Sequence, residues 1–213
     1  MSASMLEIKN VSFRYGDGPW ILKDISFNVA KGERVVLLGP SGYGKSTLAK
    51  IIAGFLKPQQ GEVLWESKPL PETGFCPVQL AYQHPEKALN PRWKMYRSLC
   101  EGGEPASEVL REMGIQEKWY ERWPNELSGG ELQRFCVARI LKPQTRVFIA
   151  DEMTTMLDAL NQAHIWEFIL RYAKEQEMTL LAVTHNRFLA DRIADRIISV
   201  PELNKITVDK SSL

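Results

Sequence analysis

The most informative segment of this chain reads Gly39-Pro40-Ser41-Gly42-Tyr43-Gly44-Lys45-Ser46-Thr47. It matches the pattern G-x-x-x-x-G-K-[ST] and stands between an apolar run and a segment of helical spacing, which is the context that the pattern requires. Glycines allow successive backbone N–H groups to turn toward an anion, and the start of a helix adds partial positive charge. The segment therefore predicts a site for nucleotide phosphates, with Lys45 reaching the β- and γ-phosphates and the Ser46 hydroxyl on Mg²⁺.

A second segment, an apolar run at 147–150, ends in Asp151-Glu152. Taken alone, such an ending is common where a strand meets a solvated turn, so its meaning depends on the phosphate loop. Beside such a loop, Asp151 is expected to hold Mg²⁺. Glu152 is expected to polarise the attacking water as a general base.

A third segment, Leu127-Ser128-Gly129-Gly130-Glu131-Leu132-Gln133-Arg134, opens a helical pattern that runs to Leu141. Its Ser-Gly-Gly start predicts a second helix N-terminus with exposed backbone N–H groups and a free hydroxyl. An ordinary helix cap with flexible glycines is the alternative interpretation. Because one nucleotide does not need two such sites in one chain, we expect Ser128, Gly129 and Gly130 to complete the nucleotide pocket of a second subunit.

The hydrophobic pattern predicts an α/β fold. Apolar and polar residues alternate around the turn at 16–18, which indicates antiparallel strands before and after it. Short apolar runs indicate buried parallel strands, and strands that alternate with helices imply a parallel sheet covered on both faces. The expected strands are 6–13, 21–30, 34–39, 61–65, 147–150 and 180–183, and the expected helices are 46–55 and 162–174. On the first helix, Leu48, Ile51, Ile52 and Phe55 are expected to share one face.

The middle of the chain differs from the sequence on either side. It is rich in Trp, Pro, Glu and Arg, and it is helical where it is periodic, at 107–113 and 131–141. We expect one domain over 1–213, in which 1–82 and 142–213 form the nucleotide-binding core with its β subdomain and 83–141 forms a helical subdomain. Its tryptophans either build the core of this insertion or line a groove for a helix of a partner protein; they are Trp93, Trp119 and Trp123.

Composition limits the classes of function. The chain has 213 residues and a net charge of +1, which argues against a nucleic-acid surface. No apolar run approaches the roughly 18 residues of a membrane span, and the first residues lack the pattern of a signal peptide. The three cysteines are odd in number and widely spaced, which favours a reducing compartment.

These motifs are similar, in kind and in order, to those of the ABC transporter ATPases, and the resemblance covers nearly the whole chain. It implies a P-loop NTPase core of the RecA-like type with a parallel sheet, an N-terminal antiparallel β subdomain and an inserted α-helical subdomain that carries the signature. ATP and Mg²⁺ are the implied cofactors, and Lys45, Glu152 and His185 are the implied catalytic residues.

The resemblance also gives each matching residue a role. Tyr15 would stack on adenine, Gly39 to Thr47 would form the Walker A loop, and His185 would contact the γ-phosphate. Asp151 and Glu152 would form Walker B, and Gln83 would contact Mg²⁺ and sense the membrane partner. Leu127 to Gln133 would form the signature, and Leu157 and Asp158 would cross a dimer interface.

The segment from Gln83 to Arg92, which contains Leu-Asn-Pro-Arg, resembles the peptide/nickel importer subfamily, and 152–158 resembles its nickel-type members. This likeness implies uptake of nickel, metal chelates or short peptides. It implies two membrane permease subunits, a second ATPase subunit that is identical or paralogous, and an extracytoplasmic binding protein, with this chain on the cytoplasmic face of the membrane. The chain departs from the subfamily at His84, where an acidic residue is usual, and in stopping soon after His185.

Two other functions compete with transport. A non-transport ABC ATPase that acts in DNA repair or on chromosomes or ribosomes usually carries coiled coils, tandem cassettes or basic extensions, none of which this sequence contains. A small-molecule kinase would share the phosphate loop, but the signature and His185 argue against it.

Overall fold

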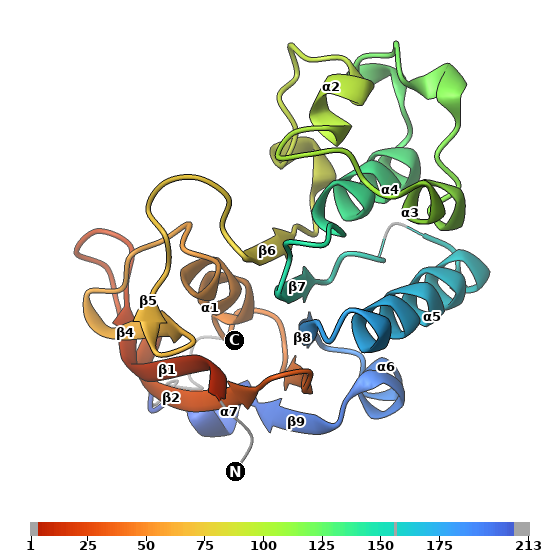
Figure 1. Ribbon diagram of the computed structural model, residues 1–213. Helices are drawn as coiled ribbons and strands as arrows, with labels where there is room; N and C mark the ends of the chain where they lie inside the picture. The colour runs from red at the N-terminus through yellow and green to blue at the C-terminus, as the bar shows by residue number, and fades with distance from the viewer. Residues whose placement is uncertain (1–3, 156, 207–213) are drawn as a thin grey trace.

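The computed structural model describes residues 4–155 and 157–206 of the chain, which form two sheets (Figure 1). The first sheet has four strands in the order β2-β1-β4-β5, and its paired strands run antiparallel. Its strands are β1 (Ser4–Phe13), β2 (Leu22–Ala30), β4 (Gln60–Trp65) and β5 (Lys68–Pro69). The antiparallel pairing predicted for the first two strands is therefore confirmed.

The second sheet has five parallel strands in the order β6-β7-β8-β3-β9. Its strands are β3 (Arg34–Leu38), β6 (Val78–Ala81), β7 (Val147–Asp151), β8 (Thr179–Thr184) and β9 (Arg196–Ser199). Every residue of β7 and β8 is buried, which explains why both segments read as continuous apolar runs.

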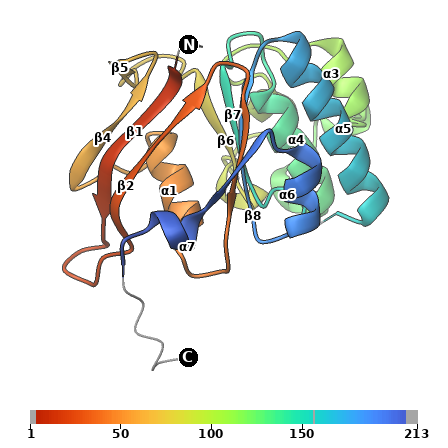
Figure 2. The ribbon, with the colours of Figure 1, turned by 90° about the horizontal axis from the view of Figure 1, so that it is seen from below.

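Alternate side chains of the parallel sheet enter two different cores. On one face, Val35 and Leu37 pack with α1 (Lys45–Ile52) and with the antiparallel sheet. On the other face, Val36 and Phe148 pack with helical residues that include those of α4 (Gly129–Ile140) and α5 (Ala159–Glu175). Figure 2 shows α1 between the two sheets and α4 and α5 on the opposite side of the parallel sheet.

Within 83–141, short helices and turns surround α4. They are α2 (Met95–Leu99), α3 (Ser107–Glu112) and the 3-10 helices at Pro85–Lys87, Glu117–Trp119 and Pro124–Glu126. Of the three tryptophans, Trp119 is buried against Phe135, whereas Trp123 is 41% exposed and Trp93 lies under the guanidinium of Arg97. The insertion thus uses one tryptophan in its core and leaves another at its surface.

The first core helix is shorter than the periodicity predicts. It ends at Ile52 because the backbone turns left-handed at Gly54, where φ is 79°, and the Phe55 N–H then bonds back to the Lys50 carbonyl. Phe55 therefore does not share the buried face of Leu48; it is 59% exposed and packs edge-on against Tyr82. The expectation for Phe55 was wrong.

The last helices, α6 (Arg187–Ile193) and α7 (Val200–Leu203), flank β9. Strands β6 and β9 have four residues each, too few for a clear period, and the sequence pattern did not reveal them. Among the described residues, no helix is both long and apolar enough to cross a membrane.

Gly61 offers a test of the antiparallel sheet. Its φ is 78°, and a Cβ there would lie 2.2 Å from the Lys9 carbonyl oxygen, so Gly61→Ala is expected to lower the free energy of unfolding by about 3 kcal/mol or more. Gly32→Ala is the control, because Gly32 has a φ of 72° and open space around it; it should lose only about 1–2 kcal/mol. Urea unfolding measures both variants, and equal losses would contradict the packing of β1 against β4.

Candidate functional site

The phosphate-loop segment forms one turn between the end of β3 and the start of α1. Gly44 precedes the helix with a φ of 81°, and a Cβ there would lie 2.8 Å from Leu22 Cδ2. Glycine is thus required by both the backbone angle and the close approach of β2. The loop borders a cavity of about 380 Å³, called here the phosphate cavity, which is lined by Ile21, Ser41, Gly42, Gly44, Lys45, Ser46, Thr47, Gln83 and Glu152.

The cavity lies where four neighbouring strands end. Gly39 follows β3, Gln83 follows β6 by two residues, Glu152 follows β7 and His185 follows β8. Because these strands are parallel and adjacent, their carboxyl ends meet at one edge of the sheet, the usual place for a ligand in such a sheet. The topology therefore brings together residues up to about 150 positions apart in the sequence.

Lys45 is buried at the start of α1, and its Nζ donates to the Pro40 carbonyl oxygen at 2.8 Å. Burial lowers the pKa of this ammonium, while the charges of Glu152 and Asp151 act in the opposite sense. The loop thus holds one cation that the fold has largely removed from water, which is suited to a triphosphate.

Asp151 is buried at the end of β7, and its Oδ1 accepts a hydrogen bond from the Ser46 hydroxyl at 2.9 Å. Burial raises the pKa of this carboxyl, the Ser46 bond lowers it, and the nearby Glu152 charge raises it. Two oxygen donors of the kind that Mg²⁺ prefers thus lie together beside the phosphate loop.

Both carboxylate oxygens of Glu152 are engaged. Oε1 lies 2.7 Å from His185 Nδ1, and Oε2 accepts from Gln83 Nε2 at 3.2 Å. The side chain is 13% exposed, and the backbone at Glu152 is left-handed, with a φ of 44°. Residues of two other loops therefore hold this carboxylate at the edge of the phosphate cavity.

Ser128 caps α4 in the expected manner. Its hydroxyl accepts from the Glu131 N–H at 3.3 Å, and the Glu131 carboxylate accepts from the Ser128 N–H at 2.7 Å. The Ser128 hydrogen bond to the carboxylate lowers the pKa of Glu131. Ser128, Gly129 and Gly130 do not line the phosphate cavity; they line another of about 520 Å³, together with Glu131, Arg134, Leu157, Asp158 and Asn161.

Tyr15 lies in the bend between β1 and β2, 51% exposed, with its ring edge-on to Phe13. It is not part of the phosphate cavity, whose lining instead includes Ile21, a residue that the motifs did not single out. Met156, which belongs to the segment that resembles nickel-type importers, lies outside the described residues.

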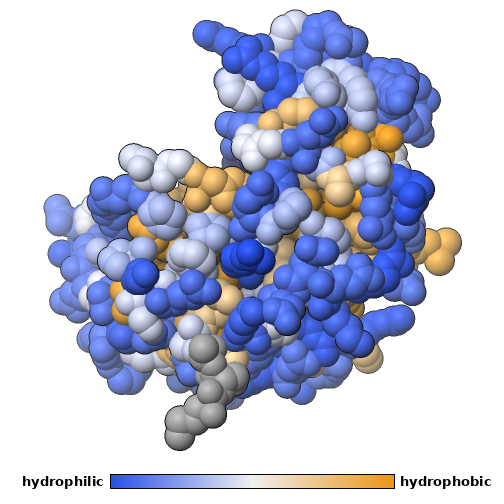
Figure 3. All heavy atoms as spheres, in the orientation of Figure 1, coloured by the Kyte–Doolittle hydropathy of each residue, from blue (hydrophilic) through white to orange (hydrophobic). Residues whose placement is uncertain are grey.

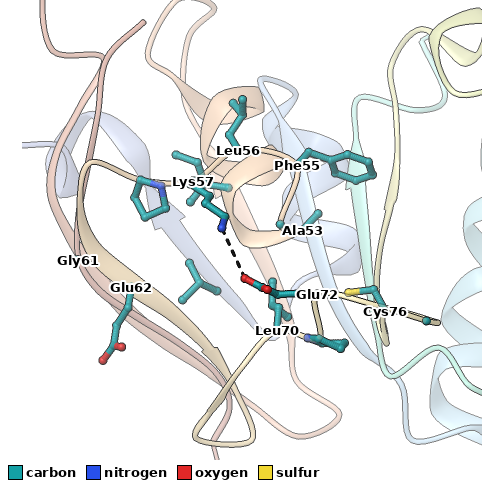
Figure 4. A pocket seen from close by; sticks show the side chains of 15 residues that line it. Ala53, Phe55, Leu56, Lys57, Gly61, Glu62, Leu70, Glu72 and Cys76 are labelled. Atoms are coloured by element: carbon teal, nitrogen blue, oxygen red, sulfur yellow. Dashed lines mark ion pairs between the residues drawn. The ribbon is translucent and has the colours of Figure 1, made fainter. Parts of the chain in front are cut away.

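A further cavity of about 730 Å³ lies away from this chemistry, between the end of α1, β4 and the segment 70–76 (Figure 4). Its lining includes Leu56 and Leu70, and the ion pair of Lys57 with Glu72, 3.5 Å long, crosses it. It contains none of the residues that the motifs predict for nucleotide binding.

Comparison with known proteins identifies the family that the chain resembles. The ABC transporter family model matches residues 22–155. The nickel import system ATP-binding protein NikE of Staphylococcus aureus is 33% identical over 211 residues, covering 91% of this chain and 85% of that protein. A dimeric post-hydrolysis structure of the ATP-binding cassette MJ0796 bound to ADP and Pi matches with a TM-score of 0.77 and 27% identity, covering 92% of this chain and 94% of the other.

A second solved structure, cbiO1 from Clostridium perfringens, is part of the ABC transporter complex cbiONQ. It matches with a TM-score of 0.73 and 26% identity, covering 93% of this chain and 86% of that one. These likenesses confirm the predicted fold class, with its parallel sheet and its antiparallel β sheet. The chain belongs to the ABC transporter family, in which it is the ATP-binding cassette, an ATPase whose hydrolysis of ATP is coupled to transport.

Proposed function

We propose that this ATPase hydrolyses ATP with Glu152 as the general base, and that it powers an importer. The observation that carries the chemical part is the carboxylate of Glu152, held by Gln83 and His185 at the edge of the phosphate cavity. In this proposal the residues 39–47 surround the phosphates, Lys45 neutralises them, His185 contacts the γ-phosphate and Tyr15 stacks on adenine. Glu152 accepts a proton from the attacking water.

Mg²⁺ fits the donor set next to this carboxylate. Ser46 Oγ and Asp151 Oδ1 are hard oxygen donors that lie 2.9 Å apart. The side-chain carbonyl oxygen of Gln83, which lines the same cavity, is a third candidate ligand. Bound there, the ion would neutralise charge that develops on the β- and γ-phosphates. Asp151 would then serve as metal ligand and Glu152 as base, which assigns neighbouring carboxylates different tasks.

We further propose that two cassettes sandwich each nucleotide, with the phosphate loop of one facing Ser128 of the other. The support is that Ser128, Gly129 and Gly130 form an exposed helix N-terminus in a hollow distinct from the phosphate cavity of the same chain. ATP then contacts both surfaces and stabilises the pair by mass action. The isolated chain is expected to be mostly monomeric without nucleotide.

Ser128→Arg is expected to prevent this pairing while sparing ATP binding to the monomer, because a long cation would occupy the place of the γ-phosphate. Sedimentation with a non-hydrolysable ATP analogue measures the pair, and Ser107→Arg, at the exposed start of α3, is the control. Turnover is measured site by site, because in a heterodimer this signature serves the partner's site. Normal hydrolysis by Ser128→Arg in every assembled site would contradict the composite site.

The membrane partners are proposed to be two permease subunits, and the transport direction is proposed to be import from the cytoplasmic face. One support is the relative named as part of a nickel import system. Another is Phe55, which is exposed and packs on Tyr82 directly before Gln83, so a partner that covers Phe55 would contact the loop that holds Glu152. Figure 3 shows apolar side chains gathered where the helical region meets the rest of the molecule. An extracytoplasmic binding protein would complete the system.

Nickel, a metal chelate or a short peptide is the proposed cargo, and this proposal depends on family likeness alone because the cassette does not contact cargo. Deleting the gene is expected to lower cellular nickel severalfold or to abolish growth on peptides as the amino-acid source. Unchanged nickel and peptide use, together with failure to take up another solute such as a sugar or phosphate, would contradict the cargo and leave the ATPase proposal standing. Copurification of permeases, and not of nucleic acid or ribosomes, would exclude the non-transport alternative.

A further inference from the structure

We propose that Gln133 and Arg134, consecutive residues of α4, are positioning residues that attach the Ser128 end of this helix to two loops of the nucleotide site. Gln133 would position the loop of Gln83, and Arg134 would position the loop that ends at Asp158. The inference rests on the proposed function, because it names the residues that connect the Ser128 end of α4 with the Gln83 and Asp158 loops of the same composite site.

Gln133 reaches toward β6. The residue is 1% exposed, and Nε2 donates to the Tyr82 carbonyl oxygen at 3.3 Å. Tyr82 precedes Gln83, whose amide in turn donates to Glu152. One hydrogen bond therefore connects the helix that Ser128 begins with the loop that orients the catalytic carboxylate.

Burying the side-chain amide of Gln133 costs free energy unless hydrogen bonds compensate for the lost contact with water. Gln133 Oε1 is buried and has no hydrogen-bond partner among residues 4–155 and 157–206. Turning the amide over would place Oε1 against the Tyr82 carbonyl, so the orientation with one bond is the better of the two. A methionine would pack in the same space without this penalty, which indicates that the bond to Tyr82 is the reason for a glutamine.

Arg134 extends from α4 to two other helices. Nη2 donates to Asn161 Oδ1 at 2.5 Å, and Nη1 donates to the Met113 carbonyl oxygen just past the end of α3 at 3.1 Å. Asn161 is itself held by Asp158, whose Oδ1 accepts from the Asn161 N–H and whose Oδ2 accepts from its side-chain amide. The guanidinium thus fixes the first turn of α5, and with it Asp158, relative to α4.

The cavity of about 520 Å³ lies beside these hydrogen bonds and is lined by residues of both α4 and the Asp158 loop. Ser128 and Gly130 line it from α4, while Leu157, Asp158 and Asn161 line it from the loop and helix after Glu152. Arg134 thus fixes the Asp158 loop relative to the Ser128 end of α4, and a second cassette would contact both. A small displacement at such a site is enough to reduce a rate strongly, on the order of 10²-fold for 1 Å.

Steady-state turnover of the assembled complex, measured site by site, tests both residues. Arg134→Met is expected to lower kcat by about tenfold or more with less than a threefold change in KM for ATP, and Arg134→Lys should recover part of the loss. Arg171→Met is the matched control, because Arg171 also connects α5 to α3, through Glu108 and Glu112, without contact to the Asp158 loop. A kcat for Arg134→Met that equals that of Arg171→Met would overturn the role of Arg134.

Gln133→Met is expected to lower kcat by a similar factor. The unfolding midpoint should stay within a few degrees of the wild type, because the substitution removes the unpaired Oε1 of Gln133 together with the hydrogen bond to Tyr82. Gln79→Met is its control; Gln79 lies on β6, the strand that precedes Tyr82, and its amide donates to the Cys76 carbonyl oxygen. A normal kcat for Gln133→Met, or a loss shared with Gln79→Met, would overturn the role of Gln133.

Hydrogen exchange separates this inference from the proposed function. In the wild type, ATP is expected to protect the amides around Gln83 and Asp158; Gln133→Met should lose the first protection, Arg134→Met the second, and the two controls neither. This readout does not need turnover. In the assembled complex, wild-type ATP binding without hydrolysis at any site would contradict the proposed function alone, whereas full protection in both variants would contradict the positioning role alone.

Discussion

Glu152→Gln is expected to leave ATP affinity within about threefold of the wild type and to reduce turnover by about 10²–10⁴-fold, the usual contribution of a general base. Binding depends on the phosphate loop and on Mg²⁺, which this change does not touch. The amide has the same shape as the carboxylate, so it can still accept one bond from Gln83 or His185, but it cannot take a proton from water.

Single-turnover hydrolysis and equilibrium ATP binding measure the two expected effects of this substitution. Glu177→Gln is the control, because that carboxylate is exposed and pairs with Lys31, away from the phosphate cavity. If Glu152→Gln in the assembled protein turns over ATP within threefold of the wild type, another group is the base and the contacts of Gln83 and His185 need a different explanation.

Lys45→Ala is expected to stop hydrolysis and to weaken ATP binding by about 10–100-fold. A charge-assisted hydrogen bond contributes about 1.5–3 kcal/mol, and each 1.4 kcal/mol is a factor of ten in affinity. The effect should lie at the upper end of this range because Lys45 is only 6% exposed, so water does not readily replace its charge.

Titration with a fluorescent ATP analogue measures this affinity. Lys57→Ala serves as the control; the Lys57 side chain is 91% exposed and lies beyond the far end of α1. Unchanged affinity and activity in Lys45→Ala would mean that the loop is only a structural turn.

Local patterns predicted the parts of the site that are contiguous in sequence. The loop 39–47, the Ser128 cap and the strand ending in Asp151 each lie where the pattern places them, because each depends on neighbouring residues. The assembly of Gln83, Glu152 and His185 could be expected only through family resemblance, since it depends on the strand order β6-β7-β8-β3, which no local pattern encodes. The roles of these residues stay predictions.

Other features depend on contacts that no sequence period reveals. The helix after the phosphate loop stops early because of one left-handed residue, Gly54, although its apolar period continues to Phe55. The sequence assigns Arg134 no role of its own within the third segment, yet its guanidinium contacts both Met113, just past the end of α3, and α5. Long-range hydrogen bonds of this kind require the packed structure before they can be seen.

The left-handed backbone at Glu152 sets up a conflict between heat resistance and activity. A non-glycine residue at a φ of 44° stores strain on the order of 1–3 kcal/mol, which glycine would release. Substitutions that relax this position would therefore raise the melting temperature while they remove the only carboxylate that both Gln83 and His185 hold among the described residues. Under the proposed role of Glu152 as the base, a laboratory selection for thermal stability alone would favour chains that have lost this carboxylate and, with it, turnover.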